Sequence, residues 1–387
     1  MRTKFDNLLG RKGTFNALAS LAAIILGLMI GFVFLLISNP SQSLDGFKAI
    51  LTGAFSNPKN VGQVFYYATP IIMTGLSVGF SKKMGLFNIG GPGQFIVGAF
   101  VAVYIGVKWT FLPPVIHTIA ALFGAFLGGV LWGIIPGIFK AYRNVNEVII
   151  CIMMNYIGMS TVNLLVRSQV YDQVKNQSYV PKSSANLPKL GMDKIFTFSG
   201  TASSVNVGFI VAIVACIAIY VLLEKTKLGY ELKACGYNFQ AAKYAGINEK
   251  RNIVLTMAIS GGLSAMGGAL LYLSGTGSGI QLTDVLAQEG FTGIPVALLG
   301  MCNPIATIFS GIFMAYLTVG GLSMQLYGFV PQIIDIISSI IIYFTAFSFF
   351  ISLFLEKRFR KDTSNANDEP KPANNLTGIE VEGGTEE

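Results

Sequence analysis

The chain has 387 residues, of which 52% are hydrophobic and only 12% are charged. A soluble domain carries about 25% charged residues, so this composition excludes an ordinary soluble enzyme or binding module. It predicts an all-α, polytopic membrane protein instead. The net charge of +8 does not by itself indicate nucleic-acid binding, because Lys and Arg beside membrane spans set the orientation of a chain.

Membrane spans are predicted wherever about 20 apolar residues follow one another, the length that crosses a hydrocarbon core. An amphipathic helix on the outer surface is predicted between the first two spans, where LDGFKAILTGAF at 44–55 has apolar residues near helical spacing. Nine stretches qualify as spans: 14–37, 61–80, 86–107, 113–138, 145–166, 206–223, 252–274, 304–323 and 331–355.

A tenth span is needed to place both basic termini on the cytoplasmic side. The apolar piece 291–302 is about 18 Å long as a helix, so it can cross only if it extends back through Asp284 and Glu289. With ten spans, 19 Lys and Arg residues lie in cytoplasmic segments and eight lie outside, as the positive-inside rule requires.

The resulting organisation has three parts: a cytoplasmic N-terminus at 1–13, a transmembrane permease domain at 14–355 and a polar tail at 356–387. The tail is too polar to bury a core and is expected to be disordered and cytoplasmic. The long polar loop 167–205 is expected outside the cell. The central basic stretch 224–251 is expected in the cytoplasm.

The two halves of the domain predict an inverted repeat. Units 61–166 and 252–355 contain four helices each and run in opposite directions, with 206–223 between them. Such repeats place a transport pathway at their interface. The small-residue patterns GAFLGG at 124–129, SGGLSAMGGAL at 260–270 and GTGSG at 275–279 predict close approach of helix backbones.

Sequence motifs for catalysis or metal binding are absent. The chain has no G-x-x-x-x-G-K-[ST] phosphate loop, no HExxH and no CxxC, so we expect no catalytic residue, no metal and no cofactor. The single histidine, His117, is expected to be neutral and packed. The four cysteines are expected to be small buried hydrophobes: Cys151, Cys216, Cys235 and Cys302.

Polar residues inside predicted spans are candidates for the translocation pathway. Glu147, Cys151 and Asn155 are spaced by four and share one helix face. For Asn155 an interhelical hydrogen bond is the alternative, and Glu147 could instead pair with Arg143 or Lys140. In FNIGGPGQF the Gly and Pro residues predict a break in the helix, which frees backbone groups beside a cavity. The pathway candidates are Phe87, Asn88, Gln94 and Asn155.

The central loop is too patterned for a simple lipid-binding basic segment, although its lysines would suit anionic lipid. Within Leu228–Gly246 we expect a turn at Gly229, then a short helix that presents a small-residue face to a second surface. The residues expected to contact an ATPase are Gly229, Glu231, Lys233, Gly236, Asn238, Ala241, Ala242 and Gly246.

LGYELKACGYNFQAAKYAGI at 228–247 resembles the cytoplasmic coupling segment of ABC importer permeases of the simple-sugar and nucleoside branch, the ribose-permease-like family. The resemblance extends over about 14–355, with ATPIIMTGLSVGF, SGGLSAMGGA and GFTGIPVALLG also in family order. GLFNIGGPGQ and NEVIICIMMNYIG are most similar to nucleoside permeases. One departure is Pro92, where many relatives carry a glutamate, and no role of that acid is carried over.

The resemblance implies the permease subunit of an ATP-driven importer in a bacterial plasma membrane, with a nucleoside as solute. It also implies three partners: an ABC ATPase, a second and often different permease, and an extracellular solute-binding lipoprotein. Membrane lipid surrounds the chain, and no nucleic acid is involved. A pentose or hexose solute is the first alternative. The second is an ion-coupled secondary transporter that uses Glu147, Asp284, Glu289 or Asp335.

Overall fold

The computed structural model describes residues 12–330, 332–341, 343 and 344, with side chains from residue 21 onward. The chain divides into two compact units, one formed by 1–23 and 347–387 and the other by 24–346. Of the first unit, the described part is the beginning of helix α2 (Lys12–Ser38). The predicted tail 356–387 lies outside the described residues.

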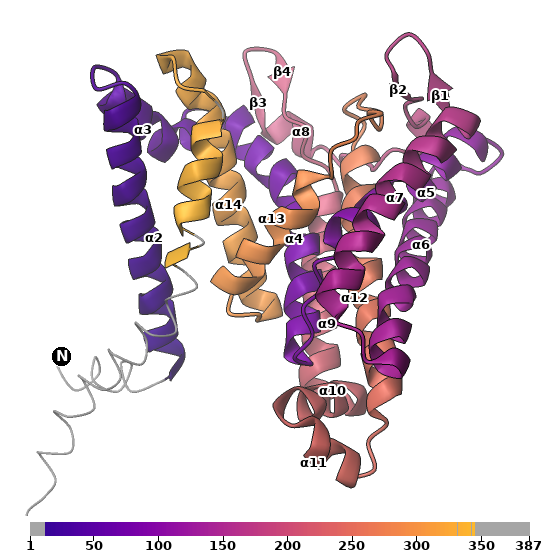
Figure 1. Cartoon of the computed structure of the whole chain (residues 1–387). Helices are drawn as coiled ribbons and strands as arrows, with labels where there is room; N and C mark the ends of the chain where they lie inside the picture. The colour runs from indigo at the N-terminus through magenta and orange to yellow at the C-terminus, as the bar shows by residue number, and fades with distance from the viewer. Residues whose placement is uncertain (1–11, 331, 342, 345–387) are drawn as a thin grey trace, which may run out of the picture. The chain divides into compact units, whose positions relative to one another are not determined.

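Eight helices of the described chain are long and apolar enough to cross a membrane (Figure 1), which confirms the predicted class of all-α, polytopic membrane protein. They are α2, α4 (Pro58–Lys83), α5 (Gly91–Lys108), α6 (Pro114–Arg143), α7 (Glu147–Gln169), α9 (Gly208–Lys225), α12 (Glu249–Tyr272) and α14 (Pro304–Met324).

The remaining helices are short. They are α3 (Ser43–Thr52), η1 (Gly53–Phe55), η2 (Ser183–Ala185), α8 (Met192–Ile195), α10 (Lys227–Tyr237), α11 (Phe239–Tyr244), α13 (Gln288–Leu299) and η3 (Gln325–Tyr327). A further apolar helix covers Gln332–Ile341. It begins the predicted span 331–355, whose later part lies outside the described residues.

Asparagine caps begin several of these helices. The side-chain oxygens of Asn57, Asn146, Asn248 and Asn303 each accept a hydrogen bond from a backbone N–H in the first turn of α4, α7, α12 and α14. Pro58 and Pro304 follow two of these caps, where a fixed φ suits the first helical residue. The sequence therefore marks these helix starts locally.

The packing follows the expected inverted arrangement. Helix α4 ends beside α10, because a Cβ atom on Gly236 would overlap the backbone of Lys83, whereas α12 begins just after α11 at that same end. The two helices therefore run in opposite directions. Helix α4 packs along α13 and α14, and α12 packs along α5 and α6 in the equivalent way. This is the packing that two inverted repeats produce.

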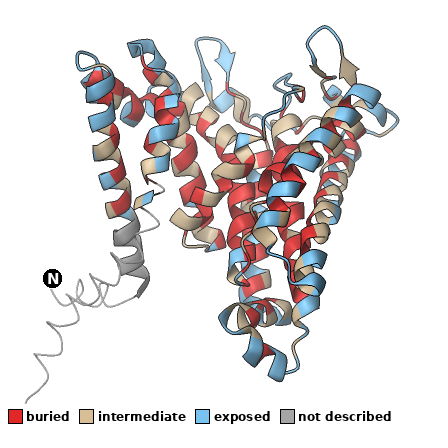
Figure 2. Ribbon diagram, viewed as in Figure 1, coloured by how far each residue is buried: buried red, intermediate tan, exposed pale blue. Residues whose placement is uncertain are grey.

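The core of the 24–346 unit is formed by the central helices (Figure 2). In α4, 83% of the spanning residues are buried, against 28% in α7. Small residues allow this close packing: a Cβ atom on Gly261 or Gly268 would overlap the backbone of α6 or α5. The prediction for GTGSG at 275–279 was wrong, because α12 ends at Tyr272 and this segment is not helical.

The surface helix predicted at 44–55 is present as α3 and η1. Its buried residues include Gly46, which lies against Phe329, and Ile50, which lies against Gly320 of α14. Tyr316 of α14 also donates a hydrogen bond to the Leu51 carbonyl. Leu44 remains exposed. Some apolar residues of this helix are therefore buried against the rest of the protein, and others are exposed on its surface.

The loop 167–205 has its own secondary structure. It contains two short antiparallel hairpins, β1 (Tyr171–Asp172) with β2 (Gln177–Ser178) and β3 (Thr197–Phe198) with β4 (Thr201–Ala202). Tyr171 pairs with Ser178 and Thr197 pairs with Ala202. Both hairpins lie at the opposite end of the helices from α10 and α11 (Figure 1).

Candidate functional site

Two of the segments that cross the membrane, called passages here, contain a non-helical stretch, or break. The helices that follow these two breaks contact each other. Residues 84–90 precede α5 and residues 280–287 precede α13, and neither segment is helical. The prediction that α5 begins at 86 and that Asp284 lies in a helix was therefore wrong. A Cβ atom on Gly290 would overlap the Cα and N atoms of Pro92. The N-terminal ends of α5 and α13 thus touch through their backbones.

This contact lies near the middle of the passages. Ser264, well inside α12, donates a hydrogen bond to the Gly91 carbonyl over 2.9 Å. Helix α13 ends at Leu299, and Cys302, just after it, lies beside Gly79, near the end of α4 that meets α10. We propose that the extended segment and α13 together make one further membrane passage, because a 12-residue helix of about 18 Å cannot cross alone.

A buried polar network holds the break before α5. Asn88 Nδ2 donates to Gln94 Oε1 over 2.9 Å and to Ser260 Oγ over 2.7 Å. The Ser260 and Ser77 hydroxyls lie 2.9 Å apart. Asn88 Oδ1 also accepts from the Gly90 N–H over 2.9 Å. These groups satisfy one another, as buried polar groups must.

The N-terminus of α5 is capped by a side chain from another helix, that of Asn155 on α7. Its Oδ1 accepts from the Gly93 N–H over 2.9 Å, and its Nδ2 donates to the Ile89 carbonyl over 3.0 Å. The local cap residue, Gly90, has no side chain that could do this. Asn155 therefore fixes both sides of the break.

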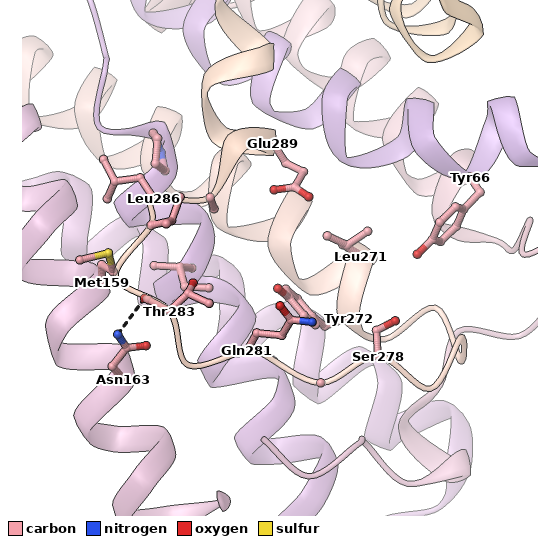
Figure 3. Close-up of a pocket in the computed structure, with 15 residues that line it drawn as sticks. Tyr66, Met159, Asn163, Leu271, Tyr272, Ser278, Gln281, Thr283, Leu286 and Glu289 are labelled. Carbon is pink, nitrogen blue, oxygen red and sulfur yellow. Dashed lines mark hydrogen bonds between the residues drawn. The ribbon is translucent and has the colours of Figure 1, made fainter. Parts of the chain in front are cut away.

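A cavity of about 300 Å³ lies on the outer side of the contact between α5 and α13 (Figure 3). Asn163 of α7 donates to the Thr283 carbonyl over 3.0 Å and so holds the extended segment against α7. The lining residues come from α4, α5, α7, α12, α13 and the non-helical stretch between α12 and α13: Tyr66, Pro92, Ile96, Met159, Asn163, Leu271, Tyr272, Ser278, Gly279, Gln281, Thr283, Val285, Leu286, Ala287 and Glu289.

The lining combines flat aromatic surface with a few polar groups. Tyr66 and Tyr272 supply rings, Gln281 supplies an amide, and Glu289 is the one charged residue among those that line the cavity. A cavity of this kind can bury an uncharged polar solute that has a planar part.

The predicted pathway residues do not line this cavity. Asn88, Gln94 and Asn155 are fully buried and act as the scaffold of the break in this conformation. Phe87 is half-buried, with Lys82 Nζ 5.2 Å from its ring centroid. Their pathway role stays a prediction. The sequence reasoning missed Tyr66, Tyr272 and Gln281, because no motif connects α4, α12 and the segment after α12.

Other sequence candidates have structural partners. Glu147 pairs with Lys140 over 2.9 Å, one of the two partners considered for it. His117 Nδ1 lies 3.0 Å from Ser184 Oγ, and its Nε2 lies 2.9 Å from the Ile105 carbonyl, which fits a packing role. Within the described residues, no group of His, Cys, Asp or Glu could hold a metal ion.

The central loop folds as the helix pair α10 and α11. Thr226 accepts from the Gly229 N–H over 3.2 Å, and Asn238 accepts from the Ala241 N–H over 3.1 Å, so each helix has a side-chain cap. Gly229 thus lies in the first turn of α10, and the turn predicted there was wrong. Gly246, with φ of +79°, ends the pair.

Several predicted contact residues face inward. A Cβ atom on Gly229 would overlap α9, and one on Gly236 would overlap the end of α4. Ala242 is buried. Lys233 bonds Glu224 of α9 over 2.9 Å. The small residues therefore seat the helix pair on the membrane helices.

A groove of about 600 Å³ runs between α10 and α11 on their outward side. Glu231, Asn238, Ala241 and Gly246 line it. Two exposed tyrosines that the prediction did not include, Tyr230 and Tyr237, also line it. Tyr244, the last residue of α11, is exposed as well. At the inner side, burial raises the pKa of the Cys235 thiol, which keeps this group protonated at neutral pH.

The inverted repeats, the broken passages and the cavity between them are features of a multi-pass membrane permease. The chain belongs to the family described as "Branched-chain amino acid transport system / permease component", whose model matches residues 60–346. This membership confirms the class of transporter that the motifs predicted.

Named relatives cover almost the whole chain. It is 36% identical to the guanosine ABC transporter permease protein NupP of Bacillus subtilis, over 89% of this chain and 97% of the relative. It is 31% identical to the nucleoside ABC transporter permease protein NupB of Lactococcus lactis, over 89% and 94%. It is 29% identical to the glucose ABC transporter permease protein TsgB13 of Haloferax volcanii, over 90% and 92%. No solved structure matches the chain.

Proposed function

We propose that the chain is the permease subunit of an ATP-driven importer that carries nucleosides into the cell. One observation carries this proposal: the full-length similarity to two permeases named for guanosine and nucleoside transport, at 36% and 31% identity. Both alignments include the broken passages and the helix pair.

The outer cavity supports the same solute class. Its tyrosines offer flat surfaces on which a purine or pyrimidine can stack. Gln281, Asn163 and Glu289 offer groups that can bond the hydroxyls of ribose. The absence of Lys and Arg from the described lining makes an anionic solute a poor candidate.

Energy is proposed to come from a separate ABC ATPase bound at the coupling segment 224–251. The chain has no phosphate loop of its own, and the groove between α10 and α11 offers a rigid contact outside the membrane. A second permease, proposed to be a different chain, would complete the pathway. An extracellular lipoprotein would deliver the solute above the loop 167–205.

A simple sugar remains the second candidate solute, because one relative is named for glucose and is nearly as similar. Ribose and free sugars share the hydroxyl groups that the polar side of the cavity could bind. An ion-coupled transporter is a third possibility, and the pairing of Glu147 with Lys140 leaves that acid less suited to bind an ion.

The proposal is tested by uptake of labelled guanosine, adenosine, uridine and glucose in cells with and without this gene. Nucleoside uptake that falls on deletion and returns with the gene is the expected result. Loss of glucose uptake with unchanged nucleoside uptake would show that the solute is a sugar. Uptake that survives ATP depletion but not loss of the ion gradient would show that the ion gradient, and not ATP, supplies the energy.

A further inference from the structure

Glu289 is the one acidic residue among those that line the outer cavity. It is the second residue of α13, and its side chain points into the outer cavity toward Gln281 and Tyr272 (Figure 3). Glu147, in contrast, has Lys140 as an ion-pair partner. No hydrogen bond or salt bridge to the Glu289 carboxylate occurs within the described residues. Its two oxygens are therefore available to a solute.

The surroundings of Glu289 explain how an unpaired carboxylate is tolerated there. The N-terminal turn of a helix carries a partial positive charge that stabilises a nearby anion, and Glu289 lies in the first turn of α13. The next residue, Gly290, is held against Pro92. The carboxylate is thus positioned by the contact between the two broken passages.

A carboxylate with two free oxygens matches one feature of a nucleoside. The 2′ and 3′ hydroxyls of ribose are adjacent O–H donors, and an ionised carboxylate can accept from both at once. Tyr66 and Tyr272 also line this cavity, and their rings can contact the planar base. A phosphorylated nucleoside would be repelled by the same charge.

We propose that Glu289 is a specificity-determining residue that recognises the vicinal hydroxyls of the solute as it enters the outer cavity. This inference rests on the proposed function, because it assigns a role within nucleoside transport. It predicts a preference for guanosine over 2′-deoxyguanosine that depends on the position and charge of this one side chain.

The test compares uptake of labelled guanosine and labelled 2′-deoxyguanosine by the complete transporter in cells. Glu289→Gln is expected to lower the guanosine preference about tenfold, the loss typical of hydrogen bonds to a charged group. Any solute-binding protein is the same in both strains, so its own selectivity cancels when the strains are compared. Immunoblots of membranes correct for abundance.

Two further variants sharpen the result. Glu289→Asp keeps the charge but withdraws the oxygens by one carbon–carbon bond, about 1.5 Å. It should also lower the preference for guanosine. This variant provides the test if the Gln variant does not reach the membrane. Asp284→Asn is the matched control, because Asp284 is exposed in the same segment and does not line the cavity. It should retain the wild-type preference.

An unchanged preference in the Glu289 variants, or an equal loss of both uptakes, would overturn the inference while nucleoside transport by the wild type still stood. If the wild type imported neither nucleoside, the proposed function itself would fail and the inference with it.

Discussion

Gly290 shows how one residue controls the site. The backbones of α13 and α5 touch at this position, and the contact sets both the floor of the cavity and the place of Glu289. A side chain cannot be accommodated by rotation, because the atoms opposite are backbone atoms of Pro92. Glycine is required here for close approach and not for an unusual φ.

We therefore expect Gly290→Ala to destabilise the protein by roughly 1–3 kcal/mol, as overpacking does. Gly79→Ala is the matched control: its Cβ atom would lie 3.5 Å from its nearest neighbour, and Ala is favoured over Gly inside a helix by about 1 kcal/mol. Thermal unfolding of the detergent-purified protein can be followed with a thiol-reactive dye, since Cys151, Cys216 and Cys235 are buried. Equal unfolding temperatures for both variants would refute the close contact.

At the scale of elements, α10 and α11 behave as a unit with two sides. Gly229, Gly236 and Ala242 are in contact with the membrane helices, whereas Tyr237 and Tyr244 are exposed. Large exposed aromatics beside a groove are typical of the residues that contribute most to protein–protein binding. We therefore expect the exposed tyrosines to contact the ATPase. The small residues on the other side hold the helix pair against the membrane helices.

Replacing both Tyr237 and Tyr244 by Ala is expected to reduce copurification of the ATPase subunit at least tenfold, because each truncation at a binding hot spot costs about 2 kcal/mol or more. Solute uptake should fall in parallel, with normal amounts of the permease in the membrane. Tyr179→Ala, in the loop 167–205 and also exposed, should leave the copurified amount unchanged. Full retention of the ATPase by the double variant would move the docking site elsewhere.

At the scale of the whole molecule, the ten-passage topology depends on counting 280–299 as one passage. The described chain has eight helices of spanning length, so helix length alone would not place this segment. Part of its extended stretch, at Gln281, Thr283 and Val285, lines the cavity, and non-helical backbone is tolerated at membrane depth where it lines a cavity. With ten passages, the two hairpins and the helix pair α10 and α11 are predicted to lie on opposite sides of the membrane.

Cysteine labelling checks this topology. In a chain whose own cysteines are replaced by Ala, Val174→Cys in the first hairpin should react with a membrane-impermeant maleimide in intact cells. Ala241→Cys in α11 should react only in inside-out vesicles. Val174 and Ala241 are both exposed, so in cells and vesicles that lack the ATPase subunit, access to the reagent is limited by the membrane alone. Labelling of both variants from the same side would overturn the topology.

The sequence by itself determined the class of the molecule, because apolar length, Lys and Arg asymmetry and helix caps are local properties. It also predicted a helix break close to Gly90, although the non-helical stretch is 84–90 and Gly91–Gly93 begin α5. The helix start after Asn238 was predicted correctly, because Gly, Pro and Asn act on their own neighbourhood. The transporter family was predicted from several motifs that occur along the chain in the same order as in the family. None of these inferences requires knowledge of which helices touch.

Only the tertiary structure decided which residues form the site. Asn88 and Asn155 are polar residues inside spans, and the sequence could not distinguish a pathway wall from a scaffold, since the choice depends on partners such as Ser260 on a distant helix. The cavity unites Tyr66 with Tyr272 and Glu289, more than 200 positions away along the chain. Such proximity arises from inverted packing of the two halves, and no local pattern encodes it.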